Sequence, residues 1–227
     1  MIEALLSTPF LGLTLTCAAW CIGIWIQKKT GHVLCNPLVI ATALIILFLS
    51  AFQIPYERYA QGGDLIAMML GPVTAVLALN IYNQRKLLGK YFLPVFLGCF
   101  VGSVVSLASV LFLCHLLQVE SSITAALLPK SVTAAIALAI SESRGGIPGI
   151  TAAAVLIAGA MGAMFAPMFS KLFRITDPIA EGVAIGAASH ALGTAKAMEL
   201  GPLQGAMSSI SLCLCGIMTS ILVLFLP

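Results

Sequence analysis

The sequence predicts an all-α polytopic membrane protein with about seven to eight membrane segments, some of them interrupted. Hydrophobic residues make up 60% of its 227 residues and charged residues 8%, whereas about 25% of the residues in a soluble domain are charged. The mean hydropathy is +1.10, and apolar runs long enough to cross a bilayer follow one another with short connections. Because these runs use up the chain, we expect a single transmembrane domain over residues 1–227.

The charged and reactive residues exclude several classes of function. The net charge is +3, and the basic residues gather near the ends of the apolar runs, where they set membrane topology and do not indicate nucleic-acid binding. Most of the seven cysteines lie in apolar runs, and Cys213 and Cys215 have no histidine or carboxylate beside them, so we expect no metal site and no cofactor. The chain also lacks a membrane-embedded pair of acids and a Ser–His–acid set, so we do not expect an enzyme.

The first two predicted spans cover residues 5–26 and 37–52. Lys28 and Lys29 follow the first span, and the positive-inside rule places that end in the cytoplasm. Pro37 stands in the first turn of the second span, where its missing N–H costs no helical hydrogen bond.

The third and fourth predicted spans cover residues 64–82 and 92–117. The third is interrupted early, at Gly71 and Pro72, and it leads into a basic cluster that predicts a cytoplasmic loop. The fourth carries small residues on one face, which indicate close packing against another helix; they are Gly98, Gly102, Ser106 and Ser109.

The fifth segment, residues 123–140, breaks two rules of a membrane span. Pro129 removes a backbone donor, and Lys130 places a charge where it costs roughly 2.5–3.5 kcal/mol or more. With the hydroxyls of Ser131 and Thr133, this cation forms a receptor for a small anion. Two alternatives remain, since Lys130 could pair with a buried carboxylate or extend to an interface, although its position near the middle of the segment disfavours the latter.

The Pro129 segment is either a broken span or a re-entrant hairpin. If every segment crosses the membrane, Lys171 and Arg174 fall outside, against the positive-inside rule. A re-entrant hairpin brings both inside. Charge counting therefore favours the hairpin, by one or two charges.

An internal repeat links this segment to the third span. Residues 73–81 match residues 132–140 at six of nine positions, and each copy follows a proline, Pro72 or Pro129. Paired interrupted segments are the sequence pattern that points most directly to a transporter's substrate site.

The last three predicted segments cover residues 148–169, 178–200 and 205–226, and the middle one is the least hydrophobic. It carries four residues at a spacing of four, which share one helical face: Gly182, Gly186, His190 and Thr194. The two glycines allow the backbone of a neighbouring helix to approach closely.

The second polar stretch of the chain contains Ser189, His190, Gly193 and Thr194, and it is too polar and too rich in glycine for an unbroken lipid-facing helix. We therefore expect a helix break at Gly193 and the second half of a substrate site here. His190 would be a substrate ligand or proton carrier, or else a structural histidine that bonds across helices. Lys196 is a second candidate cation, or it pairs with Glu199 three residues on.

Several stretches over essentially the whole chain resemble the LrgB/CidB family. The longest are residues 128–133, 145–148, 189–197 and 205–209. The chain departs from the family pattern at Asn80, where a proline is usual, and at Ala134 and Ala135, where Thr-Pro is usual. Both changes fall on the interrupted segments.

The resemblance implies a multi-pass protein of the bacterial plasma (inner) membrane and two descriptions of its function. One is an antiholin-like regulator of murein hydrolase export and cell lysis, which acts with a small LrgA/CidA-type membrane partner. The other is a carrier of small monocarboxylates such as glycolate, glycerate, lactate or pyruvate, as in the related plastidal glycolate/glycerate translocator. A pore needs no costly buried cation, so the residues favour the carrier. We expect homo-oligomers, the small partner or both.

Overall fold

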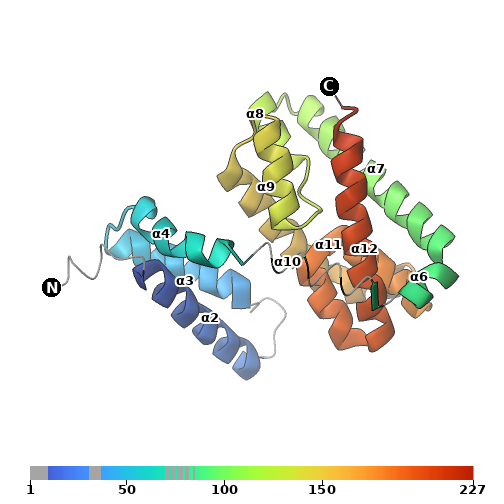
Figure 1. Cartoon of the computed structure of the whole chain (residues 1–227), viewed down its shortest axis with the longest axis horizontal. Helices are drawn as coiled ribbons and strands as arrows, with labels where there is room; N and C mark the ends of the chain where they lie inside the picture. The colour runs from blue at the N-terminus through green and yellow to red at the C-terminus, as the bar shows by residue number, and fades with distance from the viewer. Residues whose placement is uncertain are drawn as a thin grey trace. The chain divides into compact units, whose positions relative to one another are not determined.

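The computed structural model describes residues 10–30, 37–69, 72, 75, 79, 82–83 and 85–226. In this part of the chain the regular structure is entirely helical, and four helices are long and apolar enough to cross a membrane: α2, α7, α10 and α12. The prediction of an all-α membrane protein is therefore confirmed. The chain divides into two compact units, Met1–Val76 and Leu77–Pro227, which Figure 1 shows.

The first unit contains α2 (Phe10–Thr30), α3 (Pro37–Ala51) and α4 (Tyr56–Ala67). Two glycines let the other helices approach α2 closely, because a side chain at Gly23 would meet the backbone of Pro37, and one at Gly12 would meet that of Tyr59 and Gly62. Helix α3 begins at Pro37, as predicted.

The predicted interruption in the third span is mostly outside the described residues. Gly71, Asn80 and most of residues 73–81 are not described. Pro72 is described as helical, but the residues on either side of it are not described. The break and the repeat at this place therefore stay predictions.

Three long helices frame the second unit: α7 (Phe92–Leu116), α10 (Pro148–Leu172) and α12 (Pro202–Val223), with the short α6 (Arg85–Lys90) before α7. Helices α7 and α12 run in the same direction. Cys99 of α7 lies against Ser211 of α12, with 3.2 Å between sulfur and hydroxyl oxygen, and Cys114 packs in one cluster with Val223.

The Pro129 segment forms a helical hairpin of α8 (Ser121–Leu127) and α9 (Ala134–Ser143). After α9, Gly146 returns to α8, where a side chain on it would lie 2.8 Å from the backbone nitrogen of Ala126. Arg144 donates to the carbonyl of Val223 at the end of α12, at 2.9 Å. Both ends of the hairpin thus lie at the same end of the unit, which is the geometry that a re-entrant segment requires. Re-entry into the membrane, the alternative that charge counting favoured, stays a prediction.

Helix α11 (Pro178–Leu200) contains a second hairpin. Its first arm packs Gly186 against the backbone of Ser208, as the glycine spacing predicted, and its second arm packs Met198 against Gly205. Both arms therefore lie along the same half of α12. Figure 1 shows α11 beside the lower half of α12, and α8 and α9 beside the upper half.

The break in α11 is at His190 (φ 40°, ψ −132°), and the prediction of a break at Gly193 is wrong. Gly193 contributes to the turn by its lack of a side chain. A side chain there would collide with that of Ser189, so the missing Cβ makes room for the helix to fold back.

The two hairpins form an arrangement of inverted topology in residues 77–227. Each follows a long helix, α7 or α10, and these two helices run in opposite directions, so the hairpins enter from opposite ends. Inverted repeats with interrupted helices are typical of secondary transporters. The sequence did not indicate this pairing of segments.

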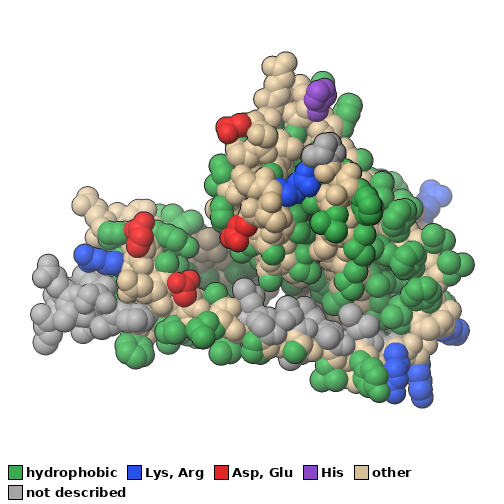
Figure 2. Space-filling view, turned by 45° about the horizontal axis from the view of Figure 1, so that its top comes forward, with side chains coloured by type: hydrophobic (Ala, Val, Ile, Leu, Met, Phe, Trp, Pro, Cys, Tyr) green, Lys and Arg blue, Asp and Glu red, His purple; other side chains and the backbone are tan. Residues whose placement is uncertain are grey.

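Basic residues mark one end of the second unit. Lys90 precedes α7, Lys171 lies in the last turn of α10, and Arg174 follows it. By the positive-inside rule this end is expected to be cytoplasmic. Figure 2 shows lysine and arginine side chains at the lower right, beyond a surface made largely of hydrophobic side chains.

Labelling from each side of the membrane tests the hairpin of α8 and α9. In a cysteine-free background, Glu120→Cys and Ser143→Cys should react with an impermeant thiol reagent from one side and Arg174→Cys from the other, because both ends of a re-entrant segment face the same compartment. Reaction of positions 120 and 143 from opposite sides would contradict the hairpin.

Candidate functional site

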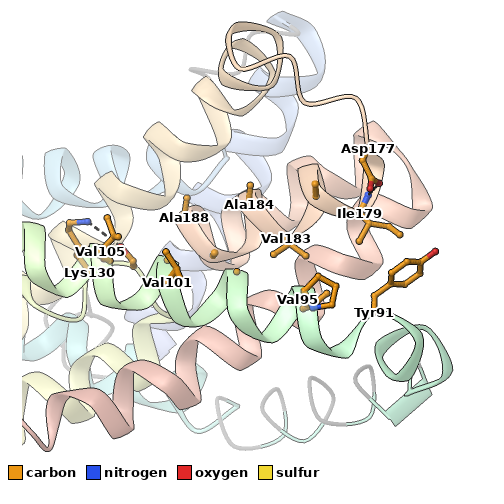
Figure 3. Close-up of a pocket in the computed structure, with 17 residues that line it drawn as sticks. Tyr91, Val95, Val101, Val105, Lys130, Asp177, Ile179, Val183, Ala184 and Ala188 are labelled. Atoms are coloured by element: carbon orange, nitrogen blue, oxygen red, sulfur yellow. Dashed lines mark hydrogen bonds between the residues drawn. The ribbon is translucent and has the colours of Figure 1, made fainter.

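A cavity of about 730 Å³ lies between α7 and α11 in the second unit. Figure 3 shows it as a groove, with Lys130 at one end and Tyr91 and Asp177 at the other. Its walls come from α7 on one side and from the first arm of α11 on the other. The tip of the first hairpin closes its inner end.

Three polar side chains meet at this inner end. The ammonium of Lys130 donates to the hydroxyl oxygen of Ser131 at 3.1 Å, and Ser106 of α7 donates to the same oxygen at 2.9 Å. Since this oxygen accepts two hydrogen bonds, the proton of Ser131 is left to be donated to a ligand. The ammonium has further protons directed away from Ser131, because a lysine carries three.

No carboxylate of the described residues pairs with Lys130. The ion pair that joins two described residues there, between Lys196 and Glu199, does not involve Lys130. The alternative was that a buried acid neutralises Lys130. No described acidic side chain is placed to do so.

The sequence around Lys130 explains its position. Helix α8 ends at Leu127, and Pro129 follows without an N–H to continue it. Leu128 and Val132, which are 3% and 1% exposed, anchor the tip on either side. The half-buried Lys130 and Ser131 between them line the cavity.

Thr133 does not line this cavity. It is the N-cap residue of α9, with extended backbone angles, and its carbonyl accepts the first hydrogen bond of the helix from Ala137 at 2.8 Å.

His190 lies at the tip of the second hairpin and also outside the cavity lining. It is 4% exposed, and its Nε2 donates to the carbonyl of Val155 in α10 at 2.9 Å. Gly159 and Gly162 of α10 leave the space that the side chains of His190 and Ser189 occupy. These contacts are those of a histidine that holds two helices together.

The remaining predicted residues of the second stretch make contacts of their own. Thr194 donates to the carbonyl of His190 at 2.8 Å and accepts from Ser208 of α12 at 2.9 Å. Lys196 lies 2.7 Å from Glu199, which confirms the predicted i,i+3 pair, and it does not line the cavity.

Sequence reasoning missed Ser106. Together with Gly98 and Gly102, it was interpreted as part of a helix-packing face, yet all three line the cavity. The available signal was a hydroxyl near the middle of an apolar span, at the depth of Lys130.

A second cavity, of about 560 Å³, lies on the other side of the first hairpin tip. Leu128 lines this cavity, whereas Lys130 lines the first. Its polar lining includes His115, Gln118 and Arg144. The tip of the first hairpin therefore stands between two cavities.

The comparisons with known proteins decide the family. A family model described as the LrgB-like family matches residues 16–227. The chain belongs to the LrgB-like family. Proteins named "Antiholin-like protein LrgB" from Bacillus mycoides, Bacillus cereus and Bacillus anthracis are each 36% identical to it over 222 residues, covering 97% of this chain and 96% of theirs. No solved structure matches the chain.

Three of the four longest stretches that resemble the LrgB-like family fall on the two hairpins, and the fourth, residues 205–209, lies in α12. Residues 128–133 form the tip of the first, residues 145–148 form the turn that brings its end back to α8, and residues 189–197 contain the turn and second arm of the other. Much of the resemblance in these stretches thus falls on the parts where the long helices are interrupted.

The packing of His190 on α10 gives a stability prediction for this LrgB-like chain. Gly159→Ala should lower the thermal stability of the purified protein, because overpacking against the His190 ring costs about 1–3 kcal/mol. Gly149→Ala, on the same helix with open space around it, is the matched control and should not. Equal melting temperatures for both variants would contradict the packing.

Proposed function

We propose that this chain is a carrier of small monocarboxylates in a bacterial plasma membrane, and that Lys130, Ser131 and Ser106 bind the carboxylate. One observation carries the proposal. The Lys130 ammonium stands at the tip of a helical hairpin, at the inner end of a large cavity, with no carboxylate partner among the described residues.

The energetics of a buried charge favour an anionic ligand. A lysine at mid-membrane costs roughly 2.5–3.5 kcal/mol or more, so it persists where it serves a function. A bound carboxylate would neutralise the charge and accept hydrogen bonds from the Lys130 ammonium and the Ser131 hydroxyl. Hydrogen bonds between charged groups are about twice as strong as those between neutral ones.

The charges along the cavity favour one carboxylate over two. Lys130 is the only basic side chain among the described residues of the lining. The far end carries Asp177, whose carboxylate accepts from the backbone N–H of Ile179 at 2.8 Å. A second carboxylate on the substrate would find no cation among the described lining residues, where the other charged side chain is an acid.

The two opposed hairpins support a carrier with alternating access. The first tip presents Lys130 to the cavity between α7 and α11, and Leu128 of the same tip faces the cavity on the other side. A small movement of this tip relative to α7 would expose the bound anion to the opposite cavity. Transport of this kind needs no continuous pore.

The second candidate function is the antiholin-like one, which the names of the relatives favour. In that case the chain would regulate murein hydrolase export together with a small LrgA/CidA-type membrane partner, and its polar residues would serve helix packing. Homo-oligomers are compatible with either function.

Transport by purified protein in liposomes tests the carrier. Counterflow of labelled glycolate, glycerate, lactate or pyruvate should be saturable, and Lys130→Ala should weaken substrate binding about 10- to 100-fold, because a hydrogen bond to a charged group contributes about 1.5–3 kcal/mol. Lys171→Ala, at the far end of α10, is the charge-matched control and should transport normally. Absent counterflow, or an unchanged Lys130→Ala variant, would contradict the proposal.

Release of trapped dyes separates the carrier from a pore. Because a carrier exposes its site to one side at a time, liposomes that contain the protein should retain a large fluorescent dye while they exchange a monocarboxylate. Loss of dye at a rate that does not saturate would favour the holin-type alternative.

A further inference from the structure

We propose that the cavity between α7 and α11 selects monocarboxylates that carry an alkyl tail, with the carboxylate at Lys130 and the tail lying along the two helices. The inference rests on the proposed function and specifies the substrate class of the same site. It makes a four- to six-carbon acid a better ligand than glycolate or glycerate.

Among the described residues of the lining, polar side chains stand only at the two ends of the cavity. Lys130, Ser131 and Ser106 form the inner end, and Tyr91 and Asp177 form the other (Figure 3). Between them the walls carry apolar side chains and glycines, among them Val101, Gly102 and Val105 of α7 and Val183, Ala184 and Ala188 of α11. The cavity thus has one cationic end and an apolar length.

The size of the cavity exceeds what a two- or three-carbon acid fills. Its volume of about 730 Å³ has room for roughly two dozen water molecules, at about 30 Å³ each. Most of the space would remain beyond a glycolate bound at Lys130, against walls that offer few hydrogen bonds. A longer tail would displace that water.

The walls offer the hydroxyl groups of a hydroxylated acid few hydrogen bonds along the cavity. A passage built for such acids would offer hydroxyl or amide groups along its length, because a polar group taken from water needs a partner. No side chain between Ser106 and Tyr91 on the α7 wall supplies one, since the lining residues there are proline, valine and glycine. These walls suit methylene groups.

Two glycines on α7 leave the groove free of side chains at the place where α7 packs against α11. A Cβ on Gly102 would lie 3.7 Å from that of Ala187, and a Cβ on Gly98 would lie 3.7 Å from Val183. The two helices therefore touch beneath the groove. Gly102 is one helical turn, about 6 Å, from Ser106 towards the mouth. A large side chain at this position would occupy the path of a tail.

A chain-length series tests the inference. Acetate, propionate, butyrate, valerate and hexanoate are compared as inhibitors of labelled glycolate counterflow, at a pH where all are ionised. Each added methylene should lower the inhibition constant about fourfold, because each is transferred from water to an apolar wall. Hexanol and hexanamide control for partition into the bilayer and should inhibit weakly. Equal inhibition by all five acids would overturn the inference.

Variants that fill the groove locate the tail. Gly102→Leu should remove the gain from added methylenes, and Ala184→Leu on the opposite wall should do the same, so the test survives if one variant does not fold. Gly149→Leu, in open space on α10, controls for the substitution. If inhibition still strengthens with each added methylene in both groove variants, the inference is overturned.

Failure of the proposed function has a different signature. If no monocarboxylate is transported, the carrier proposal fails, and the series is then measured as thermal stabilisation of the protein in lipid nanodiscs. Stabilisation that grows with tail length, and is lost in Gly102→Leu, supports the site. Stabilisation that does not depend on tail length overturns it.

Discussion

The cation at Lys130, held at the tip of a hairpin inside the apolar part of the molecule, is the constraint on which the rest of the second unit depends. The hairpin must turn at Pro129 to bring the lysine there, and its apolar neighbours Leu128 and Val132 must be buried to keep it there. The base of the hairpin is fixed as well. The Thr151 hydroxyl of α10 donates to that of Ser141 at 2.6 Å, and Gly146 donates to the Ser141 carbonyl at 2.8 Å.

Irregular backbone at membrane depth imposes a second condition, because it is tolerated only where protein buries it or where it lines a watery cavity. The two hairpins meet this condition in different ways. The first tip lines the cavity at Lys130, whereas the second is buried and its polar groups are bonded to α10 and α12 through His190 and Thr194. One tip is therefore placed to bind a ligand, and the other to hold helices together.

Much of this arrangement could be predicted from local chemistry. Each prediction rests on a property of a few neighbouring residues. Hydrophobicity predicts the long apolar helices, the missing N–H predicts the break at Pro129, and the missing side chain predicts the close approach at Gly186. A break in α11 could also be predicted, although three residues from its observed place at His190. The fold-back of its second arm could not, because that turn depends on the space that Gly193 leaves for Ser189. Ser106 was missed for a similar reason. It becomes a site residue only when a hairpin 25 positions along the chain returns to it.

The most direct test of the account is a crystal structure with a carboxylate that carries an anomalous scatterer, such as 3-(methylseleno)propionate. The account predicts the carboxylate within hydrogen-bonding distance of the Lys130 ammonium and the Ser131 hydroxyl, with the selenium between α7 and α11. A carboxylate bound elsewhere, for example beside Arg144 in the second cavity, would contradict it. So would a Lys130 ammonium already paired with a carboxylate of the protein.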